Sequence, residues 1–151
     1  MVTYIKSGNI FNLQGVSNYA HGCNCAGAMG KGIALQFKKK YPPMYVEYKK
    51  LCKDGLFSLG DIFTYNYGNG IIFNLGTQTT WKTKADLNAI KVSLIKMLSY
   101  ASQNNIHEIA LPKIGAGLGG LNWDDVKNII DKVARDYPAI DLFVVENYKE
   151  I

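Results

Sequence analysis

Glycines gather at two places in this chain, and both places are suited to holding a phosphate. Eight of the 15 glycines fall in two windows, Gly22–Gly32 and Gly115–Gly120. Each window follows a strand-like segment and precedes a helix-like one. In such a turn the backbone N–H groups can approach an anion closely, and the helix dipole favours negative charge. The two windows together predict a diphosphate or nucleotide cradle, although tight loops that only need flexible backbone would also be rich in glycine.

One histidine stands where it could perform acid–base chemistry. His21 directly precedes the first window, and an imidazole can accept or donate a proton near neutral pH. A half-buried strand histidine bonded to backbone is the alternative. His21, Cys23 and Cys25 alternate and would share one face of a strand, but no second Cys/His pair accompanies them, so we expect buried thiols and no metal site. A Cys23–His21 nucleophilic pair is also disfavoured, because same-face neighbours on a strand are about 7 Å apart.

Two phosphate-binding motifs can be compared with these windows. Gly30-Lys31-Gly32 lacks the hydroxyl residue that follows the lysine of a Walker loop and holds magnesium. Gly115–Gly120 does fit the glycine spacing of a dinucleotide fingerprint, and Asp141 follows about 20 residues later. Only one strand remains after that, too little for the rest of a doubly wound cofactor domain on that side. We therefore expect neither a Walker loop nor a dinucleotide-binding fingerprint in this chain.

Composition and charge exclude several classes of protein. Apolar residues make up 48% of the chain and charged residues 19%, which excludes extended disorder, collagen-like repeats and coiled coil. No apolar run approaches the roughly 20 residues of a membrane span, and no secretory signal is visible. We expect one domain, residues 1–151, in the cytoplasm. The formal charge of +5 favours anionic partners, but a solvated helix face explains the lysines of Lys38–Lys53 better than a nucleic-acid surface does.

Strand-like and helix-like segments alternate along the chain. Strands are expected at 3–6, 17–21, 62–67, 71–75, 109–111 and 142–145, and helices at 32–40, 45–52, 87–101 and 126–137. Gly68-Asn69-Gly70 predicts an antiparallel hairpin. Thr83 with Asp86 resembles a capping box before the third helix, and Asn122 suits the start of the fourth. The segments predict a mixed α/β layered domain.

Three stretches, 20–25, 27–34 and 111–123, resemble a macrodomain in sequence, order and spacing. The resemblance runs from about Val2 to Val145 and is to the branch of the yeast-type ADP-ribose-1''-phosphate phosphatases and terminal ADP-ribose protein glycohydrolases. It implies a three-layer α/β/α sandwich around a mixed six-stranded sheet. It also implies ADP-ribose as the ligand, with no metal and no cofactor.

The resemblance assigns roles to individual positions. Gly8, Asn9 and Ile10 would meet the adenine, Asn24 the terminal ribose, and residues 74–78, Thr77 included, the distal end. The first loop would bind the diphosphate and terminal ribose, and the second loop the phosphates from the other side, through Met29, Gly30, Lys31, Gly32 and Ile33 and through Gly115, Ala116, Gly117, Leu118 and Gly119. Many macrodomains have Asp where this chain has Asn9, which can still accept a hydrogen bond from the adenine amino group.

Besides Asn9, the chain differs from these relatives at residues that they use in catalysis. The terminal glycohydrolases use a lysine near the end of the fourth strand and an aspartate in the second glycine loop, where this chain has Thr77 or Gln78 and Gly119. The same absence argues against a macrodomain that removes ADP-ribose from DNA, unless Lys82 or Lys84 reaches in. His21, Asn24 and Gln78 remain as the catalytic candidates.

We therefore expect a hydrolase that acts at the terminal ribose of ADP-ribose, and we favour the phosphate of ADP-ribose-1''-phosphate as the leaving group. The alternatives are a hydrolase of ADP-ribosyl esters or of O-acetyl-ADP-ribose, and a reader of ADP-ribose without catalysis. An ADP-ribosylated protein is a further candidate partner, whereas nucleic acid and membrane are not expected. Tyr41, Trp81 and Trp123 could stack on the ligand, although most aromatic residues fill cores.

Overall fold

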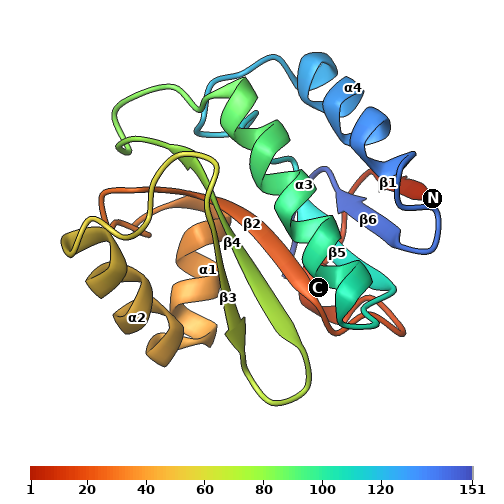
Figure 1. Ribbon diagram of the computed structural model, residues 1–151, viewed down its shortest axis with the longest axis horizontal. Coiled ribbons are helices and arrows are strands. Elements are labelled where there is room, and N and C mark those ends of the chain that lie inside the picture. The colour runs from red at the N-terminus through yellow and green to blue at the C-terminus, as the bar shows by residue number, and fades with distance from the viewer. Residues whose placement is uncertain (151) are drawn as a thin grey trace.

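The computed structural model describes residues 1–150 and contains one six-stranded sheet with helices on both faces (Figure 1). The strands are β1 (Val2–Ile5), β2 (Tyr19–Asn24), β3 (Ile62–Asn66), β4 (Ile71–Gln78), β5 (Glu108–Pro112) and β6 (Asp141–Val145). Their order is β1-β6-β5-β2-β4-β3, and each neighbouring pair is parallel except β3 and β4. The predicted mixed sheet and antiparallel hairpin are confirmed.

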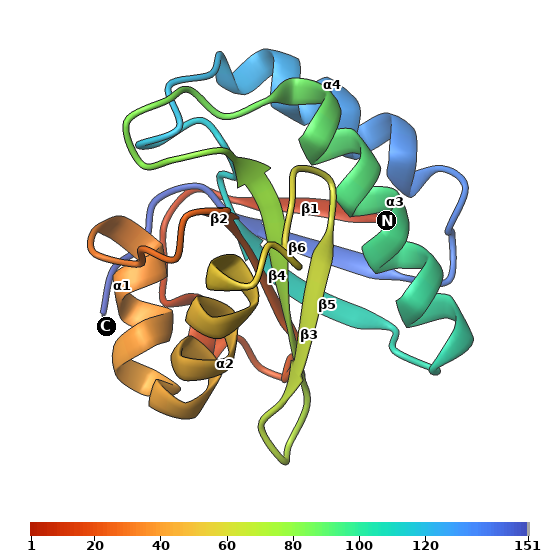
Figure 2. The ribbon, with the colours of Figure 1, turned by 60° about the vertical axis from the view of Figure 1, so that its left-hand side comes forward.

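The helices form a layer on each side of the sheet (Figure 2). α1 (Gly32–Lys40) and α2 (Pro42–Lys53) cover one face, and α3 (Leu87–Gln103) and α4 (Trp123–Ala134) cover the other. Side chains along a strand alternate between the faces, so Ala20 of β2 packs toward α3 and α4 while Tyr19 and Cys23 pack toward α1 and α2. This is the three-layer α/β/α sandwich that the resemblance implied.

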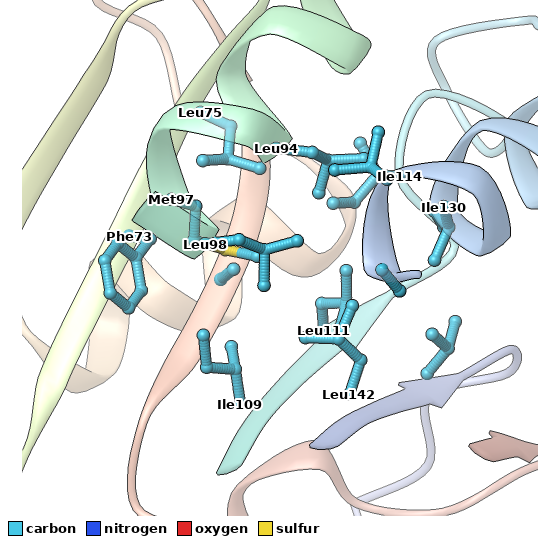
Figure 3. Packing of buried hydrophobic residues seen from close by; sticks show 14 of the residues in the cluster. Phe73, Leu75, Leu94, Met97, Leu98, Ile109, Leu111, Ile114, Ile130 and Leu142 are labelled. Carbon is cyan, nitrogen blue, oxygen red and sulfur yellow. The ribbon is translucent and has the colours of Figure 1, made fainter. Parts of the chain in front are cut away.

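The larger core lies between the sheet and α3 and α4 (Figure 3). Leu94 and Met97 of α3 meet Phe73 and Leu75 of β4, and all four side chains are buried. Each such burial contributes about 1.5–3 kcal/mol. The helical stripes predicted from sequence point into this core, and the sheet is a rigid platform for the loops at its edge.

Several element boundaries differ from the predicted ones. α3 begins at Leu87 with Asp86 as its N-cap, whose Oδ1 accepts from the Ala89 N–H at 2.8 Å; the hydroxyl of Thr83 is bonded to Thr80 instead. α2 begins at Pro42, because prolines fit a first turn, where no backbone N–H is needed. The Asn122 cap of α4 is confirmed, since its side chain accepts from two N–H groups of the first turn.

β2 and β4 both continue three residues beyond their predicted ends, to Asn24 and Gln78, where they still pair with each other. Because β1, β6, β5, β2 and β4 run parallel, their carboxyl ends lie along one edge of the sheet. Both glycine windows follow strands at this edge. No helix within residues 1–150 is both long enough and apolar enough to cross a membrane.

Candidate functional site

A cavity of about 730 Å³ opens at this edge of the sheet. Its lining comes from the carboxyl ends of four parallel strands and from the segments that follow them. The lining residues are Gly22–Asn24 and Ala28–Ala34, then Thr77, Gln78 and Trp81, then Pro112–Gly115 and Gly117–Gly119, and finally Val145, Glu146 and Tyr148. Clefts outside the carboxyl ends of parallel strands are the usual binding sites of open α/β sheets. The cavity is large enough for a nucleotide-sized ligand.

The first loop, residues 25–31 between β2 and α1, is held by polar side chains. The Asn24 Oδ1 accepts from the N–H groups of Ala26 at 3.0 Å and Ala28 at 3.2 Å, and its Nδ2 donates to the Ala28 carbonyl at 2.8 Å. The buried hydroxyl of Tyr48 donates to the Asn24 carbonyl at 2.6 Å, and the Tyr45 hydroxyl donates to the Gly27 carbonyl at 3.0 Å. Asn24 is therefore a positioning residue whose amide fixes this loop.

The second loop, residues 113–120 between β5 and α4, is held by its own backbone. Gly115 has φ +73°, and its carbonyl accepts from the Leu121 N–H at 2.9 Å. A Cβ atom at Gly119 would lie 2.6 Å from the Gly115 carbonyl oxygen, so only glycine fits there. The Gly119 carbonyl in turn accepts from the Ala85 N–H at 2.9 Å, which ties this loop to the segment before α3.

Both loops present unused backbone donors. Within residues 1–150, the N–H groups of Gly30, Lys31, Gly117 and Leu118 donate no hydrogen bond. α1 begins after Lys31 without a side-chain cap, so its first N–H groups also lack that partner. Such groups at a helix N-terminus bind anions. The two windows thus have the chemistry predicted for a phosphate cradle.

Leu118 connects the two loops across the cavity. Its side chain is 70% exposed, yet its Cδ1 lies 3.2 Å from the position that a Cβ atom of Gly32 would occupy. Gly32 has φ +62°, a conformation that residues other than glycine rarely adopt. The loops therefore touch at this point, and a ligand that spans both must fit beside it.

Few ionisable side chains line the cavity. Lys31 is exposed and Lys113 is half-buried, and both lysines belong to the lining of the cavity that the unused donors face. Burial raises the pKa of the Cys23 thiol well above its usual value, which keeps it protonated. Glu146 is the one carboxylate among the described lining residues, and it accepts from the Trp123 indole N–H at 2.6 Å. The site is suited to binding and stabilising anions rather than to proton transfer by a histidine.

The prediction that His21 is catalytic is contradicted by its position. β2 extends to Asn24, so His21 lies inside the strand, is fully buried, and does not line the cavity. Its ring stacks on Phe37 of α1 at 4.1 Å between ring centres, and its Nε2 lies 2.6 Å from the Asn74 Oδ1. Burial lowers the pKa of His21 to about 4, so the imidazole is neutral at physiological pH. It supports the sheet beneath the first loop.

Four other residues predicted to contact the ligand are not part of the cavity lining, although one of them, Gly8, is bridged to Tyr148, which is. Gly8, Asn9 and Ile10 do not line the cavity. The Asn9 Oδ1 accepts from the Phe11 N–H at 2.9 Å as the cap of a 3-10 helix, Ile10–Asn12, and Ile10 is fully buried. Ala116 is likewise outside the lining, whereas its neighbours Gly115 and Gly117 are part of it.

The remaining predicted residues are brought together as expected. Asn24, Thr77 and Gln78 line the cavity with both glycine loops, namely Met29–Ile33 and Gly115 with Gly117–Gly119. Gln78 donates from Nε2 to the Thr83 carbonyl, so its amide is tied to the loop before α3. Of the three aromatic candidates, only Trp81 lines the cavity; Tyr41 packs among Phe11, Phe37 and Tyr67, and Trp123 contacts Tyr4.

The cavity lining also includes residues that no motif predicted, namely Lys113 and the segment after β6 with Glu146 and Tyr148. A signal was present, because a β6 parallel to β5 must end at the same edge as the second glycine loop. No three His, Cys, Asp or Glu side chains within residues 1–150 are arranged to hold a metal ion.

Comparisons with known proteins agree with this geometry. A relative named DNA ADP-ribosyl glycohydrolase from Mycobacterium tuberculosis is 37% identical over 125 residues, which is 80% of this chain and 36% of the relative. A relative named ADP-ribose 1''-phosphate phosphatase, from Lodderomyces elongisporus, is 29% identical over 84% of this chain and 86% of its own length. The chain thus spans about a third of the length of the first of these.

Among solved structures, the macrodomain of M. tuberculosis DarG superposes with a TM-score of 0.89 at 34% identity, covering 100% of this chain and 99% of that one. The family model described as Macro domain matches residues 20–130. That match spans most of the chain, the cradle from Asn24 to Gly119 included, and the chain therefore belongs to the Macro domain family.

Proposed function

We propose that this chain binds ADP-ribose in the cavity and hydrolyses a bond between its terminal ribose and a leaving group. The observation that carries the proposal is the pair of glycine loops, which face one cavity with unused N–H donors. The diphosphate of ADP-ribose would accept from these donors, beside the uncapped N-terminus of α1. Lys31 and Lys113 add positive charge at the same place.

The chemistry would rest on placement and electrostatics. Hydrolysis adds water across one bond: the hydroxyl group ends on the anomeric carbon or on phosphorus, and a proton goes to the departing group. Donors that are already in place stabilise the charge that develops on that group without reorganisation. Asn24 and Gln78 border the cavity, and their amides are anchored by the loops, so they can position the ribose and the attacking water.

The leaving group that we favour is a DNA base. Three relatives named DNA ADP-ribosyl glycohydrolase are 35–37% identical to this chain, a fusion protein with the same activity in its name is 27% identical, and the named phosphatase is 29% identical. This choice departs from the expectation, drawn from the sequence, that nucleic acid is not a partner. It places removal of ADP-ribose from DNA first among the candidate activities.

Phosphate remains the second candidate leaving group, and Gln78 favours it. An amide cannot serve as an acid or base, and the cavity presents no lysine at the end of β4. A phosphate that departs already carries negative charge, so two N–H cradles and two lysines can stabilise it without such a residue. ADP-ribose-1''-phosphate would then be the substrate.

A direct comparison of substrates tests the proposal. The protein is titrated with ADP-ribose by calorimetry, with ADP and AMP as comparison ligands. It is then incubated in catalytic amounts with a single-stranded DNA oligonucleotide that carries one base-linked ADP-ribosyl group and, separately, with ADP-ribose-1''-phosphate. Released ADP-ribose is separated by chromatography. We expect tighter binding of ADP-ribose than of ADP or AMP, and many turnovers on the DNA substrate.

The possible outcomes separate the candidates. Turnover of the phosphate alone would make the chain a phosphatase, and binding without turnover on either substrate would make it a reader of ADP-ribose. Equal affinity for ADP-ribose, ADP and AMP would mean that the terminal ribose is not recognised. That result would refute the proposal.

A further inference from the structure

The segment that joins β4 to α3 presents an aromatic ring at the mouth of the cavity. Trp81 lines the cavity and is nevertheless 62% exposed. The Lys82 ammonium lies 5.1 Å from the centre of the indole ring, and no other aromatic side chain within residues 1–150 packs against that ring. An aromatic ring left open at the mouth of a cavity can stack on a planar group of a partner.

The turn that carries Trp81 is ordered by its own hydrogen bonds. The Thr83 hydroxyl accepts from the Thr80 N–H at 3.1 Å and donates to the Thr80 carbonyl at 3.0 Å. Outside the turn, the Asp86 N–H donates to the Thr77 carbonyl at 2.7 Å. The ring is thus presented by a preformed turn, so binding of a partner does not cost the conformational entropy of ordering the loop.

Positive charge is concentrated in this turn, and the nearest acidic residue along the chain, Asp86, is engaged as the N-cap of α3. Residues 77–85 include Lys82 and Lys84 and no acidic residue. The stem of Lys84 lies over the second glycine loop, with its Cγ 3.5 Å from the position of a Cβ atom on Gly120. Lys113 lines the cavity beside that loop. An exposed ring among lysines is the combination that holds single-stranded nucleic acid, because bases stack on the ring and phosphates meet the ammonium groups.

We infer that Trp81 stacks on an unpaired base next to the ADP-ribosylated base of a DNA strand, while Lys82 and Lys84 contact the adjoining phosphates. The inference rests on the proposed function and assigns the part of the site that selects the macromolecule. A base within a duplex is already stacked on both sides, so this surface selects single-stranded DNA. Gln78, the last residue of β4, donates to the Thr83 carbonyl and so ties this surface to the sheet.

A binding cycle with the full chain tests the stacking. The affinity of the wild type and of Trp81→Ala is measured for free ADP-ribose, for a single-stranded oligonucleotide with one base-linked ADP-ribosyl group, and for the same oligonucleotide with abasic neighbours. We expect Trp81→Ala to weaken binding of the intact oligonucleotide about 10-fold more than binding of free ADP-ribose, since stacking of one base is worth about that factor. Abasic neighbours should weaken binding of the oligonucleotide to the wild type by a similar factor, and they should hardly change its binding to the variant.

Two further variants make the result specific. Trp81→Phe should recover part of the lost affinity, because a smaller ring still stacks. Leu56→Ala removes an equally exposed apolar side chain, 67% exposed, from outside the cavity lining, and should have no effect on either ligand. Melting temperatures check that all variants fold.

Two results would overturn the inference. An equal loss for free ADP-ribose and for the oligonucleotide would place Trp81 in the ADP-ribose pocket itself. A wild type that binds free ADP-ribose but gains nothing from the attached strand, or binds an ADP-ribosylated peptide as well, would remove DNA as the partner while the proposed function stands. Failure of the wild type to bind ADP-ribose would instead refute the proposed function.

Discussion

The two glycine loops serve one cavity but are built in different ways. The first loop takes its shape from side chains: Asn24 bonds three backbone groups within it, Tyr48 bonds the Asn24 carbonyl just before it, and Tyr45 bonds the Gly27 carbonyl inside it. The second takes its shape from missing side chains, because Gly119 lies against the backbone of Gly115. One cradle therefore depends on buried polar groups, and the other depends on residues that have no Cβ atom.

The strands beneath the loops differ in the same sense. His21 of β2 forms a buried polar pair with Asn74 of the neighbouring β4. β5 instead places apolar Ile109 and Leu111 in the core. A buried polar pair stabilises the fold only while it stays in the right protonation state. We therefore expect the support of the first loop, and not that of the second, to depend on pH.

The largest expected effect is a loss of stability in acid that is caused by protonation of His21. The pKa of this imidazole is about 4 in the folded state and about 6.5 in the unfolded state. Between these values the unfolded chain binds the extra proton, so the contribution is complete above pH 6.5 and is lost as the pH falls toward 4. At pH 4 the loss of unfolding free energy reaches about 3 kcal/mol. Urea unfolding of the wild type and of His21→Gln from pH 7 to pH 4 measures it.

Glutamine is the matched replacement because its amide can still donate to Asn74 but does not titrate. The free energy of unfolding should therefore fall less steeply with decreasing pH in the variant than in the wild type. Carboxylates contribute equally to both proteins and cancel in the difference. Parallel pH curves would show that His21 is not held neutral.

The second prediction concerns the loop that is built from glycine. A Cβ atom at Gly117 would meet nothing within 4 Å, and the residue lines the cavity, so Gly117→Leu should fill the cradle and leave the fold intact. We expect at least about a 100-fold loss of affinity for ADP-ribose, or about 2.7 kcal/mol, measured by calorimetry. The melting temperature should hardly change.

Gly119→Ala provides the contrast within the same loop. Its single methyl group would lie 2.6 Å from the Gly115 carbonyl oxygen, so the backbone itself must shift. This variant should lose stability, by about 1–3 kcal/mol, as well as affinity. If Gly117→Leu bound ADP-ribose as the wild type does, the loop would not contact the ligand.

Much of this arrangement could be predicted from the sequence, because it depends on local rules. The stripe from Leu87 to Ala101 has the period of a helix, and Asn122 has the side chain of a cap. The glycine windows could be placed at the cavity because each separates a strand from a helix. The family resemblance added the three-layer fold, which the structure confirms.

The failures have physical causes that lie outside local sequence. The burial of His21 depends on Phe37 of α1 and Asn74 of β4, and no pattern around residue 21 reports those contacts. Contact between Asn9 and adenine stays a prediction, because the fold uses the Asn9 side chain to cap the short helix that follows and leaves it outside the cavity lining. Whether a polar group faces a ligand or completes a turn is decided by the partners that the fold brings to it.

The smallest predicted effect tests the side-chain support of the first loop. Tyr48→Phe removes a buried hydroxyl that donates to the Asn24 carbonyl at 2.6 Å and also lies 3.0 Å from the Asn24 Oδ1. The expected cost is about 1–2 kcal/mol of unfolding free energy, with a few-fold loss of affinity for ADP-ribose as the loop becomes less fixed.

Tyr45→Phe is the matched control, because its hydroxyl makes one bond, to the Gly27 carbonyl, from a half-buried position. Its cost should stay below about 1 kcal/mol. Urea unfolding and calorimetry measure both. A Tyr48→Phe variant as stable as the wild type would mean that Asn24 and the backbone alone set the shape of the first loop, and the contrast between the two loops would then disappear.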